Sequence, residues 1–454
     1  GVDLEEMVQG ITRTTVRISH PASALSQVRA AVRAARNPAN PGPVLVVGSI
    51  DQLDDQALHG PNSVQPPLSN PRAVDDGLMK RIADVLEHAA RPLMVLGAGC
   101  RPVADAMREL VDAVGIPFMT TPQAKGIVSE EHPLSLRNGG MSASQWARKY
   151  TQAGPDVTLV LASDLDDSST AGTRPIRHGG TLIHVDTDKR VLGRNFTTAI
   201  PVAHDAGVFA WQLAAEMRAR NSTALARRGA ALAAEARRDS PFEVAYFESD
   251  SAVPIAPHRV VADLERAAGP RTTFVTDIGE HMLFALHYLT VCGPDRFVIH
   301  LGLGSMASGI ASSVGLALAD RSRTVVCICG DGGMQMAGME ILLAIKHRLP
   351  IVYAIFNDAR YNMVYHGHRL TFGHASDWET PQIDFVKWAE SAGARGQRIE
   401  RPGEITQELL AGPLKDGVPL VLDVRQDRDV RIQGEGRISA MIQMQRGTRS
   451  KEKR

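Results

Sequence analysis

Residues 325–363 read VVCICGDGGMQMAGMEILLAIKHRLPIVYAIFNDARYNM, a run that predicts one strand–turn–helix–strand unit. The apolar residues 325–329 form a buried strand that leads into a Gly-Asp-Gly-Gly turn. A helix is predicted over 336–347, and after a Leu-Pro break a second apolar strand covers 351–356 and leads into Asn-Asp. Polar residues therefore follow both strands, and ligands of open parallel α/β sheets bind at such strand ends.

The turn after the first strand has the composition of a phosphate and metal site. Gly332 and Gly333 let backbone amides approach phosphate oxygens closely, and the following helix directs its positive end at the same place. Asp331 and Asp358 offer carboxylate oxygens, which suit a Mg²⁺ ion that bridges phosphates. One strand–helix–strand crossover separates these two aspartates, so we expect both at the same edge of the sheet.

The whole unit resembles the signature of thiamine diphosphate enzymes: Gly-Asp-Gly, a helix, Leu-Pro, an apolar strand and Asn-Asp. This resemblance implies that Asp331, Asp358 and the main-chain carbonyl of Arg360 bind Mg²⁺. Asp358 stands where Asn is commoner in the family, and it gives the site one extra negative charge. A carboxylate is a normal Mg²⁺ ligand, so the site should still hold the ion.

Length and charge narrow the class of protein. The 454 residues are enough for two or three domains, and the formal net charge of zero argues against nucleic acid or an anionic membrane as the main partner. No apolar run reaches membrane-spanning length. Cys327 and Cys329 share one face of an apolar strand, where buried small hydrophobic residues are favoured over half of a metal site. We expect a cytoplasmic α/β protein with Rossmann-like parallel sheets and helices on both faces.

The first fifty residues predict only a strand, a helix and a strand, which make too small a core for a domain. They resemble the closing part of the pyrimidine-binding domain in acetohydroxyacid (acetolactate) synthase-like enzymes. In that family the rest of the domain carries a glutamate that activates the cofactor. No acidic residue in 1–48 has a matching context, since Glu5 and Glu6 lie near the terminus. We therefore expect either one half of a naturally split enzyme, whose partner chain supplies this glutamate, or a fragment of a longer chain. A degenerate homologue without the usual chemistry is the third possibility. Residues 51–75 read as a polar, proline-containing linker.

Residues 76–212 alternate helices with strands, which predicts a parallel sheet. They resemble the central domain of the same enzymes. Gly97-Ala-Gly99 follows a strand but lacks the third glycine of a dinucleotide loop. FAD is possible here, but we do not favour it, because Ser168-Ser-Thr-Ala-Gly172 departs from the flavin-contacting pattern. Residues 213–254 are expected to be a connecting segment with a solvated, charged helix over 213–238.

Residues 255–440 resemble the diphosphate- and Mg²⁺-binding domain, and residues 441–454 are expected to be a flexible tail. By this resemblance Gly279 and His281 face the diphosphate, although a histidine at a helix start can also be a simple cap. Glu280 replaces a Gln and is expected to point away from the diphosphate. The carbonyl of Gly304 accepts a hydrogen bond from the cofactor's amino group. Met306 wedges under the bent cofactor, with an ordinary core position as the alternative.

The resemblance implies a cofactor-binding set drawn from four segments of this domain. It comprises Gly279, His281, Gly304, Met306, Asp331, Gly332, Gly333, Asp358, Arg360, Tyr361, Asn362 and Met363. Tyr365, His366 and His368 are then expected near the mouth of the substrate pocket. A histidine there could shuttle protons at neutral pH, or these residues could form an ordinary surface loop.

The function implied is thiamine diphosphate- and Mg²⁺-dependent transfer of an acyl anion from a small 2-oxo acid, after loss of CO₂. The cofactor performs the difficult chemistry. We expect the chain to be one subunit of a split carboligase in a hetero-oligomer, either a dimer of heterodimers or a larger assembly. A 2-oxo acid decarboxylase or 2-hydroxyacyl-CoA lyase is the alternative within the family. A catalytically silent scaffold is the alternative outside enzymes.

Overall fold

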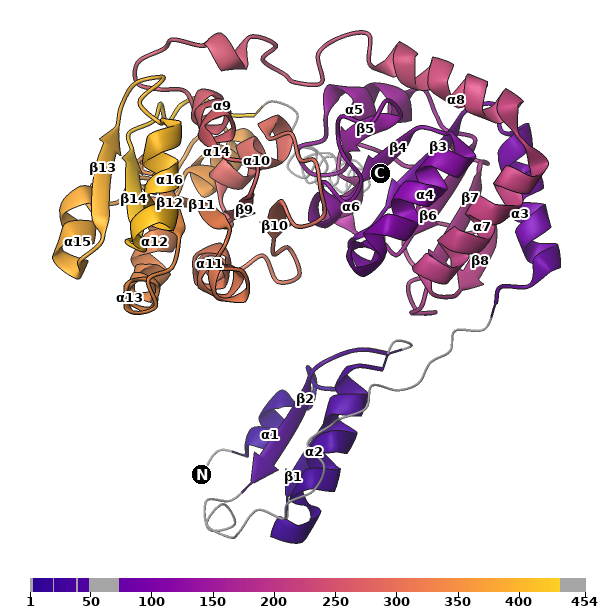
Figure 1. The fold of residues 1–454 in the computed structure, drawn as a ribbon, viewed down its shortest axis with the longest axis horizontal. Helices are drawn as coiled ribbons and strands as arrows, with labels where there is room; N and C mark the ends of the chain where they lie inside the picture. Colours follow the sequence, from indigo (N-terminus) through magenta and orange to yellow (C-terminus); the bar gives the residue numbers. More distant parts are fainter. Residues whose placement is uncertain (1–2, 19, 38–39, 49–72, 433–454) are drawn as a thin grey trace, which may run out of the picture.

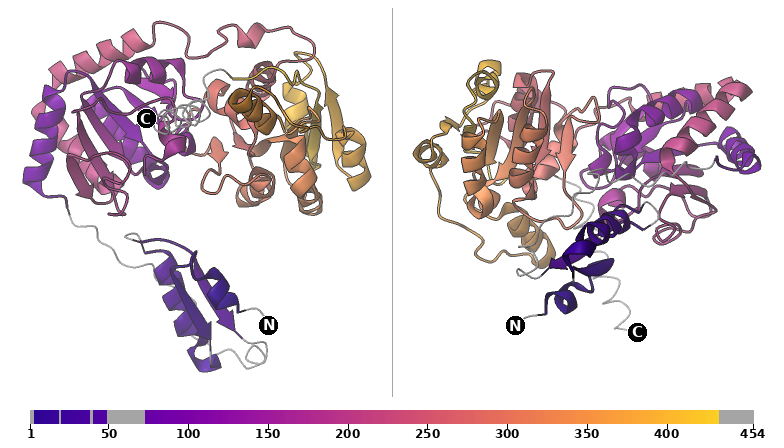
Figure 2. Two further views of the ribbon diagram at one scale, coloured as in Figure 1. Left: turned by 180° about the vertical axis from the view of Figure 1, so that it is seen from behind. Right: turned by 60° about the horizontal axis from the view of Figure 1, so that its bottom comes forward.

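The computed structural model describes residues 3–18, 20–37, 40–48 and 73–432. The predicted tail and nearly all of the predicted linker lie outside these residues. Two six-stranded sheets dominate the described chain, every strand pairing within each of them is parallel, and helices cover both faces (Figures 1 and 2). The predicted α/β fold class is thereby confirmed. Among the described helices, none is both long and apolar enough to cross a membrane.

The first large sheet has the strand order β5-β4-β3-β6-β7-β8. Its strands are β3 (Pro92–Leu96), β4 (Phe118–Thr120), β5 (Ser135–Asn138), β6 (Val157–Leu161), β7 (Thr181–Asp186) and β8 (Ile200–Ala203). The central strands β3 and β6 are buried along their whole length. A parallel strand covered on both faces reads as a continuous apolar run, which is why the sequence located these strands.

Five longer helices pack around this sheet, and two of them correct an expectation. They are α3 (Asp76–His88), α4 (Ala104–Val114), α5 (Gln145–Gln152), α7 (Ala206–Arg220) and α8 (Thr223–Ala236). The charged stretch 213–238 is not one solvated connecting helix. It spans the end of α7 and all of α8, which separate at Asn221 in the left-handed conformation. Both helices bury small apolar side chains in the core of this sheet, so their charged residues line only the outer face.

The Gly97-Ala-Gly99 loop serves internal packing. A Cβ on Gly97 would lie 2.1 Å from the carbonyl oxygen of Ala162, so glycine is required for the approach of β3 to the end of β6. Arg101 follows on the same loop, η2 (Ala98–Val103), and donates to the carbonyl of Phe297 (2.9 Å) in the second large sheet. Close contact with protein backbone therefore accounts for these glycines.

The second large sheet has the order β10-β9-β11-β12-β14-β13. Its strands are β9 (Thr272–Thr276), β10 (Phe297–Ile299), β11 (Thr324–Gly330), β12 (Ile351–Phe356), β13 (Arg395–Ile399) and β14 (Leu420–Val424). Its main helices are α9 (Pro257–Ala267), α10 (Glu280–Tyr288), α11 (Ser308–Ala319), α14 (Asn362–Phe372), α15 (Phe385–Ala392) and α16 (Gln407–Asp416). Cys327 and Cys329 are buried in the core beside β11, as free thiols.

The helix predicted over 336–347 begins earlier and is interrupted. Helix α12 (Asp331–Ala337) starts directly at the aspartate, a 3₁₀ turn covers Gly338–Glu340, and α13 (Ile341–Lys346) follows. The interruption coincides with a tight contact, because a Cβ on Gly338 would lie 3.1 Å from the indole of Trp388. Asp331 therefore occupies the first turn of a helix, where the helix dipole favours a negative charge.

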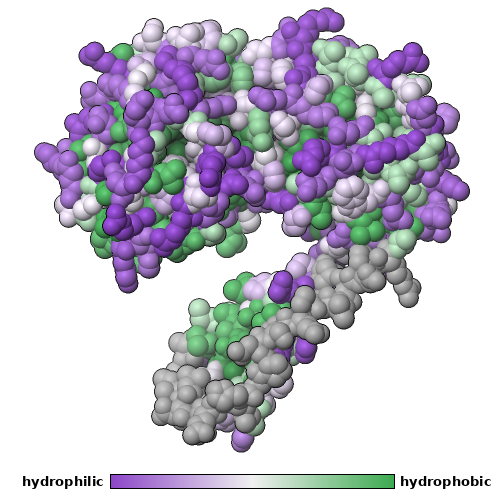
Figure 3. All heavy atoms as spheres, in the orientation of Figure 1, coloured by the Kyte–Doolittle hydropathy of each residue, from purple (hydrophilic) through white to green (hydrophobic). Residues whose placement is uncertain are grey.

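The N-terminal module consists of α1 (Leu4–Val8), β1 (Thr14–Ile18), α2 (Pro21–Ala35) and β2 (Val44–Gly48). Its two strands pair in parallel, and Ala31 is the only buried residue among those described here. Several large apolar side chains lie exposed on it, and Figure 3 shows apolar surface on this module. The exposed side chains are Leu4, Met7, Ile11, Leu25, Val28 and Val46. A two-stranded sheet with so little core needs further polypeptide to be stable.

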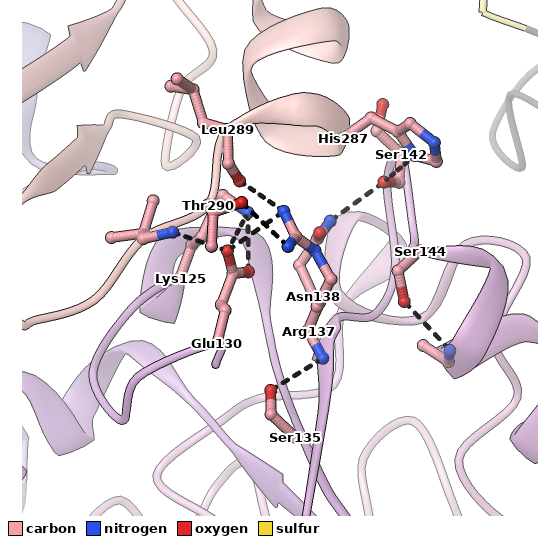
Figure 4. Close-up of polar contacts among 12 residues, drawn as sticks. Lys125, Glu130, Ser135, Arg137, Asn138, Ser142, Ser144, His287, Leu289 and Thr290 are labelled. Atoms are coloured by element: carbon pink, nitrogen blue, oxygen red, sulfur yellow. Dashed lines mark hydrogen bonds and ion pairs between the residues drawn. The ribbon is translucent and has the colours of Figure 1, made fainter. Parts of the chain in front are cut away.

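A buried ion-pair network joins the two large sheets (Figure 4). The Glu130 carboxylate accepts hydrogen bonds from Lys125 Nζ (2.7 and 2.9 Å) and from the backbone amide of Val291 (2.8 Å). Arg137 Nη2 lies 3.4 Å from the same carboxylate and donates to the carbonyl of Leu289 (2.7 Å). Lys125 and Glu130 come from the first sheet, whereas residues 289–291 follow α10. Burial lowers the pKa of Lys125 to about 8.

Replacing Glu130 with alanine is expected to destabilise the protein by about 3–5 kcal/mol, because Lys125 and Arg137 would remain buried without the carboxylate that pairs with them directly. Denaturant unfolding followed by circular dichroism measures this change. Asp105→Ala is the matched control, since it removes an exposed pair with Arg108 and should change stability by less than about 1 kcal/mol. Equal unfolding midpoints for the two variants would show that the buried network contributes no more to stability than the exposed ion pair.

Candidate functional site

One pocket of about 810 Å³ opens at the carboxyl ends of β9, β11, β12 and β14. Its walls come from residues that follow these strands and from the starts of the next helices. The lining residues are Ile278, Gly279, Glu280, His281, Phe284, Met306, Gly330, Asp331, Gly332, Gly333, Phe356, Asp358, Arg360, Tyr361, Asn362, Met363, Val364 and Gln426. A pocket with this mixture of apolar wall and polar groups, at the strand ends of a parallel sheet, matches a small-molecule site.

Every residue of the predicted cofactor-binding set lines this pocket except Gly304. Gly304 lies in a solvent-exposed loop, and its neighbour Leu303 is 97% exposed. Tyr365 and His366 line a neighbouring pocket instead. His368 lines neither pocket, and its Nδ1 hydrogen-bonds to the carbonyl of His374 (2.8 Å).

The pocket also contains residues that sequence reasoning did not select. Gln426 is the most informative of these, because it follows β14, which pairs with β12 in the sheet. Its position after a strand of this sheet would have identified Gln426 as a site residue if the pairing of β12 with β14 had been known. Phe284 and Phe356 add apolar wall, and neither carries a local signal that separates it from ordinary core.

The Asp331 carboxylate ties together the two loops that carry the predicted metal ligands. It accepts hydrogen bonds from the backbone amides of Gly332 (2.8 Å) and Ala359 (2.9 Å). Ala359 has a left-handed backbone (φ 53°), which is costly for a residue with a Cβ. Burial raises the pKa of Asp331 to about 6. The carboxylate therefore fixes the chain that follows β12 beside the chain that follows β11.

Asp358 is the most perturbed acid of the pocket. Burial, together with the nearby charges of Asp331 and Glu280, raises the pKa of its carboxyl to about 8. Its carboxylate accepts two long hydrogen bonds, from the amide of Arg360 and from Gln426 Nε2 (3.3 Å each). Acids crowded together in this way are stabilised by a bound cation, so the electrostatics of the pocket favour a divalent metal.

Glu280 lines the pocket, and its charge contributes to the raised pKa of Asp358. His366 Nδ1 donates a hydrogen bond to its Oε1 (2.7 Å), and both side chains are buried. Oε2 of Glu280 is buried without a hydrogen-bond partner among the described residues. The pairing with His366 provides the partner for a carboxylate that would otherwise be buried alone.

Met306 is placed in the pocket by a buried aspartate. The Asp277 carboxylate accepts hydrogen bonds from the amides of Ala307 and Gly309 (2.9 Å each) at the start of α11. Ala307 has a left-handed backbone (φ 72°), so this loop is held in a strained conformation. Gly333 packs against the same carboxylate, since a Cβ there would lie 2.3 Å from Asp277 Oδ2. Asp277 therefore connects the Met306 loop to the glycine turn.

His281 is buried beside the same turn. Its Nε2 hydrogen-bonds to the main-chain carbonyl of Asp277 (3.0 Å), and burial lowers the pKa of the imidazole to about 4. The ring is therefore neutral at neutral pH and Nε2 is the donor nitrogen. Its ring also contacts Gly330, where a Cβ would lie 3.1 Å from Nδ1. His281 thus helps to shape the turn at Gly330, which is more than capping α10.

The donor set and the shape of the pocket fit a diphosphate with Mg²⁺. Two carboxylates, of Asp331 and Asp358, and the carbonyl of Arg360 are hard oxygen donors. A Cβ on Gly332 would lie 2.7 Å from the ring of Tyr361 and 3.3 Å from Met306, so only glycine leaves the turn open. No group of three or more His, Cys, Asp or Glu side chains among the described residues forms a complete metal site. A metal bound here would need further oxygen ligands from water or from a bound small molecule, as Mg²⁺ commonly does.

We expect Asp277→Asn to lower the free energy of unfolding by about 1–3 kcal/mol, because an amide group would face one of the two backbone donors. Denaturant titration measures the loss. Asp320→Asn, at the end of α11, is the control: its contacts with Ser322 and Arg323 are solvent-accessible, so it should change stability by less than about 1 kcal/mol. An unchanged stability of Asp277→Asn would show that the Met306 loop does not depend on this carboxylate.

Two family models match the chain. Residues 79–213 match "Thiamine pyrophosphate enzyme, central domain", and residues 277–424 match "Thiamine pyrophosphate enzyme, C-terminal TPP binding domain". The two matches coincide with the two large sheets. Thiamine pyrophosphate is another name for thiamine diphosphate. The residues of the second match include nearly all of those that line the pocket described above.

Similar curated proteins agree with these matches. The chain is 28% identical to a probable acetolactate synthase large subunit of Methanocaldococcus jannaschii, over 93% of this chain and 73% of that protein. It is 27% identical to a probable acetolactate synthase large subunit of Methanococcus aeolicus (79% and 61%). It is 26% identical to acetolactate synthase isozyme 3 large subunit of Escherichia coli (81% and 65%). The chain thus spans less than two thirds of the length of the last two relatives. It belongs to the thiamine pyrophosphate enzymes, carries their central and C-terminal domains, and is similar to acetolactate synthase large subunits.

Proposed function

We propose that this chain binds thiamine diphosphate with Mg²⁺ in the 810 Å³ pocket and acts as an acetolactate synthase-like carboligase on a small 2-oxo acid. The observation that carries the proposal is the convergence of Asp331, Asp358 and the Gly332-Gly333 turn in one pocket of a family member. When bound, the cofactor supplies the nucleophilic carbon that attacks a 2-oxo acid and permits loss of CO₂.

The residues of this chain would have separate tasks. Carboxylate oxygens of Asp331 and Asp358 and the carbonyl of Arg360 would hold Mg²⁺ against the diphosphate. Backbone amides of the glycine turn and the positive end of α12 would bind the phosphate oxygens. Met306, partly buried against the core of this sheet, would support the apolar part of the cofactor.

We propose that a partner chain contributes the glutamate that activates the cofactor, in a hetero-oligomer. Two observations support this. The acids that line the pocket, Glu280, Asp331 and Asp358, lie beside the predicted metal and diphosphate end and leave none for the apolar end near Met306. The N-terminal module exposes apolar side chains over a two-stranded sheet, which suits completion by further polypeptide.

Thiamine diphosphate binding in the presence of Mg²⁺ is the direct test. Calorimetric titration of the full chain should give saturable binding, and Asp331→Asn should weaken it by at least about tenfold through loss of a metal ligand. Asp320→Asn is the control and should bind like the unchanged chain. The titration is repeated with any chain that co-purifies, together with a CO₂-release assay on pyruvate. Absence of binding in every combination would overturn the enzymatic proposal.

Cofactor binding should also depend on pH. Below about pH 8 the Asp358 carboxyl of the free protein is largely protonated, and it must lose this proton to bind Mg²⁺. Affinity should therefore rise from pH 6 to pH 8 and then level off, with proton release on binding. Calorimetry in two buffers of different ionisation enthalpy counts the protons released.

Asp358→Asn is the matched variant for this dependence, because it keeps the shape and removes the titrating group. Cofactor binding to this variant should release fewer protons, and its affinity should be nearly constant above pH 7. Folding stability follows the opposite trend. The raised pKa favours the protonated folded form, so the contribution of Asp358 to stability is lost as pH rises towards 8. A pH-independent affinity in the unchanged chain would contradict the predicted role of Asp358.

A further inference from the structure

A second pocket, of about 1130 Å³, lies beside the cofactor pocket. Helix α14 forms one wall, and residues 428–431, which follow β14, form another. Arg360 lines both pockets. Its guanidinium is buried, and its Nε donates to Asn362 Oδ1 (2.7 Å), so this side chain is a fixed part of the partition between them.

The second pocket carries an excess of positive charge. Two of its arginines are matched by acids, since Arg360 pairs with Asp429 and Arg428 with Glu379 (3.1 Å each). Two further arginines, Arg369 and Arg431, have no carboxylate partner among the residues that the structure describes. Two of the four arginines that line the pocket, both of them exposed, therefore lack a paired acid, and Arg431 also lines an adjoining pocket.

Arg369 is held in place by a short stack of side chains on α14. Its Nη1 donates to the hydroxyl of Tyr365 one turn earlier (3.4 Å). The ring of Tyr365 lies 3.8 Å from the guanidinium carbon of Arg360. The ring of Tyr365 is fixed by Arg360, and its hydroxyl accepts a long hydrogen bond from the exposed Arg369, which restricts the freedom of that side chain before a ligand binds.

His366 connects this pocket to the cofactor pocket. It lines the second pocket, while its hydrogen-bond partner Glu280 lines the first (2.7 Å). An imidazole is either neutral or positive, so His366 adds no negative charge to balance Arg369 and Arg431. The second pocket is thus a basic compartment separated from the acidic cofactor pocket by a hydrogen-bonded wall.

We propose that this second pocket binds the dianionic oxyanion group of a small molecule, a phosphate or a pair of carboxylates, through Arg369 and Arg431. Two free guanidinium groups match a doubly charged ligand, and the planar donor fork binds such groups with paired hydrogen bonds. The site stands independently of the proposed function, because none of its unpaired arginines belongs to the predicted cofactor-binding set.

The test uses the full chain saturated with thiamine diphosphate and Mg²⁺, so that the cofactor pocket cannot take the probe. Inorganic phosphate and succinate are titrated separately at constant ionic strength, with sodium chloride as the balancing salt. Saturable one-to-one binding of at least one probe is expected, and the tighter of the two identifies the chemistry of the natural ligand. Arg369→Gln should weaken it at least tenfold, and Arg369→Lys less, because lysine keeps the charge without the fork.

Arg321→Gln removes an exposed arginine of the same domain outside the pocket and is the matched control. It should bind the probes like the unchanged chain. Equal weakening in Arg369→Gln and Arg321→Gln, or no saturable binding of either probe, would overturn the proposal. The titration is repeated on Asp331→Asn without cofactor, to separate anion binding in the second pocket from thiamine diphosphate binding in the first. The second pocket of this variant should still bind its probe, even if the chain never binds thiamine diphosphate.

Discussion

The hydrogen bond from the Ala359 amide to the Asp331 carboxylate holds the candidate site together. It joins the loop after β11 to the loop after β12 and brings both predicted metal ligands to one sheet edge. The acceptor is buried, so the bond costs one carboxylate its hydration. The left-handed conformation of Ala359 adds backbone strain at the same point. The lost hydration and the backbone strain both occur where a bound ligand could offset them, as is common at functional sites.

Charge is distributed unevenly around this bond. Asp331, Asp358 and Glu280 gather on the cofactor side, and their mutual repulsion contributes to the raised pKa of Asp358. Arg360 and His366 separate this acidic pocket from a basic one. Opposite potentials on two sides of one wall allow a cation-requiring ligand and an anion to bind next to each other without competing. Such an arrangement gives each pocket its own selectivity.

The two domains meet through buried polar contacts, with Glu130 between Lys125 and the amide of Val291. These contacts need specific geometry, because a displacement of one domain would leave buried charges without their partners. They attach the first sheet to the end of α10, whose start lines the candidate site. The central domain therefore packs against the end of a helix whose start lines the site. The tight packing of its glycine loop against Ala162 is consistent with a structural role for this domain.

Much of the fold and part of the site could be predicted from the sequence alone. The apolar strands β11 and β12 were located by their continuous hydrophobicity, and Asp331 and Asp358 were predicted at their ends, because periodicity and turn residues are local properties. Only the tertiary structure revealed the contributions of Asp277, Gln426 and the Glu280–His366 pair. Their partners lie far away in the chain, and local patterns do not encode which strands become neighbours. The same reason explains the helices of 206–236, whose charged outer faces concealed a buried apolar side until the packing was known.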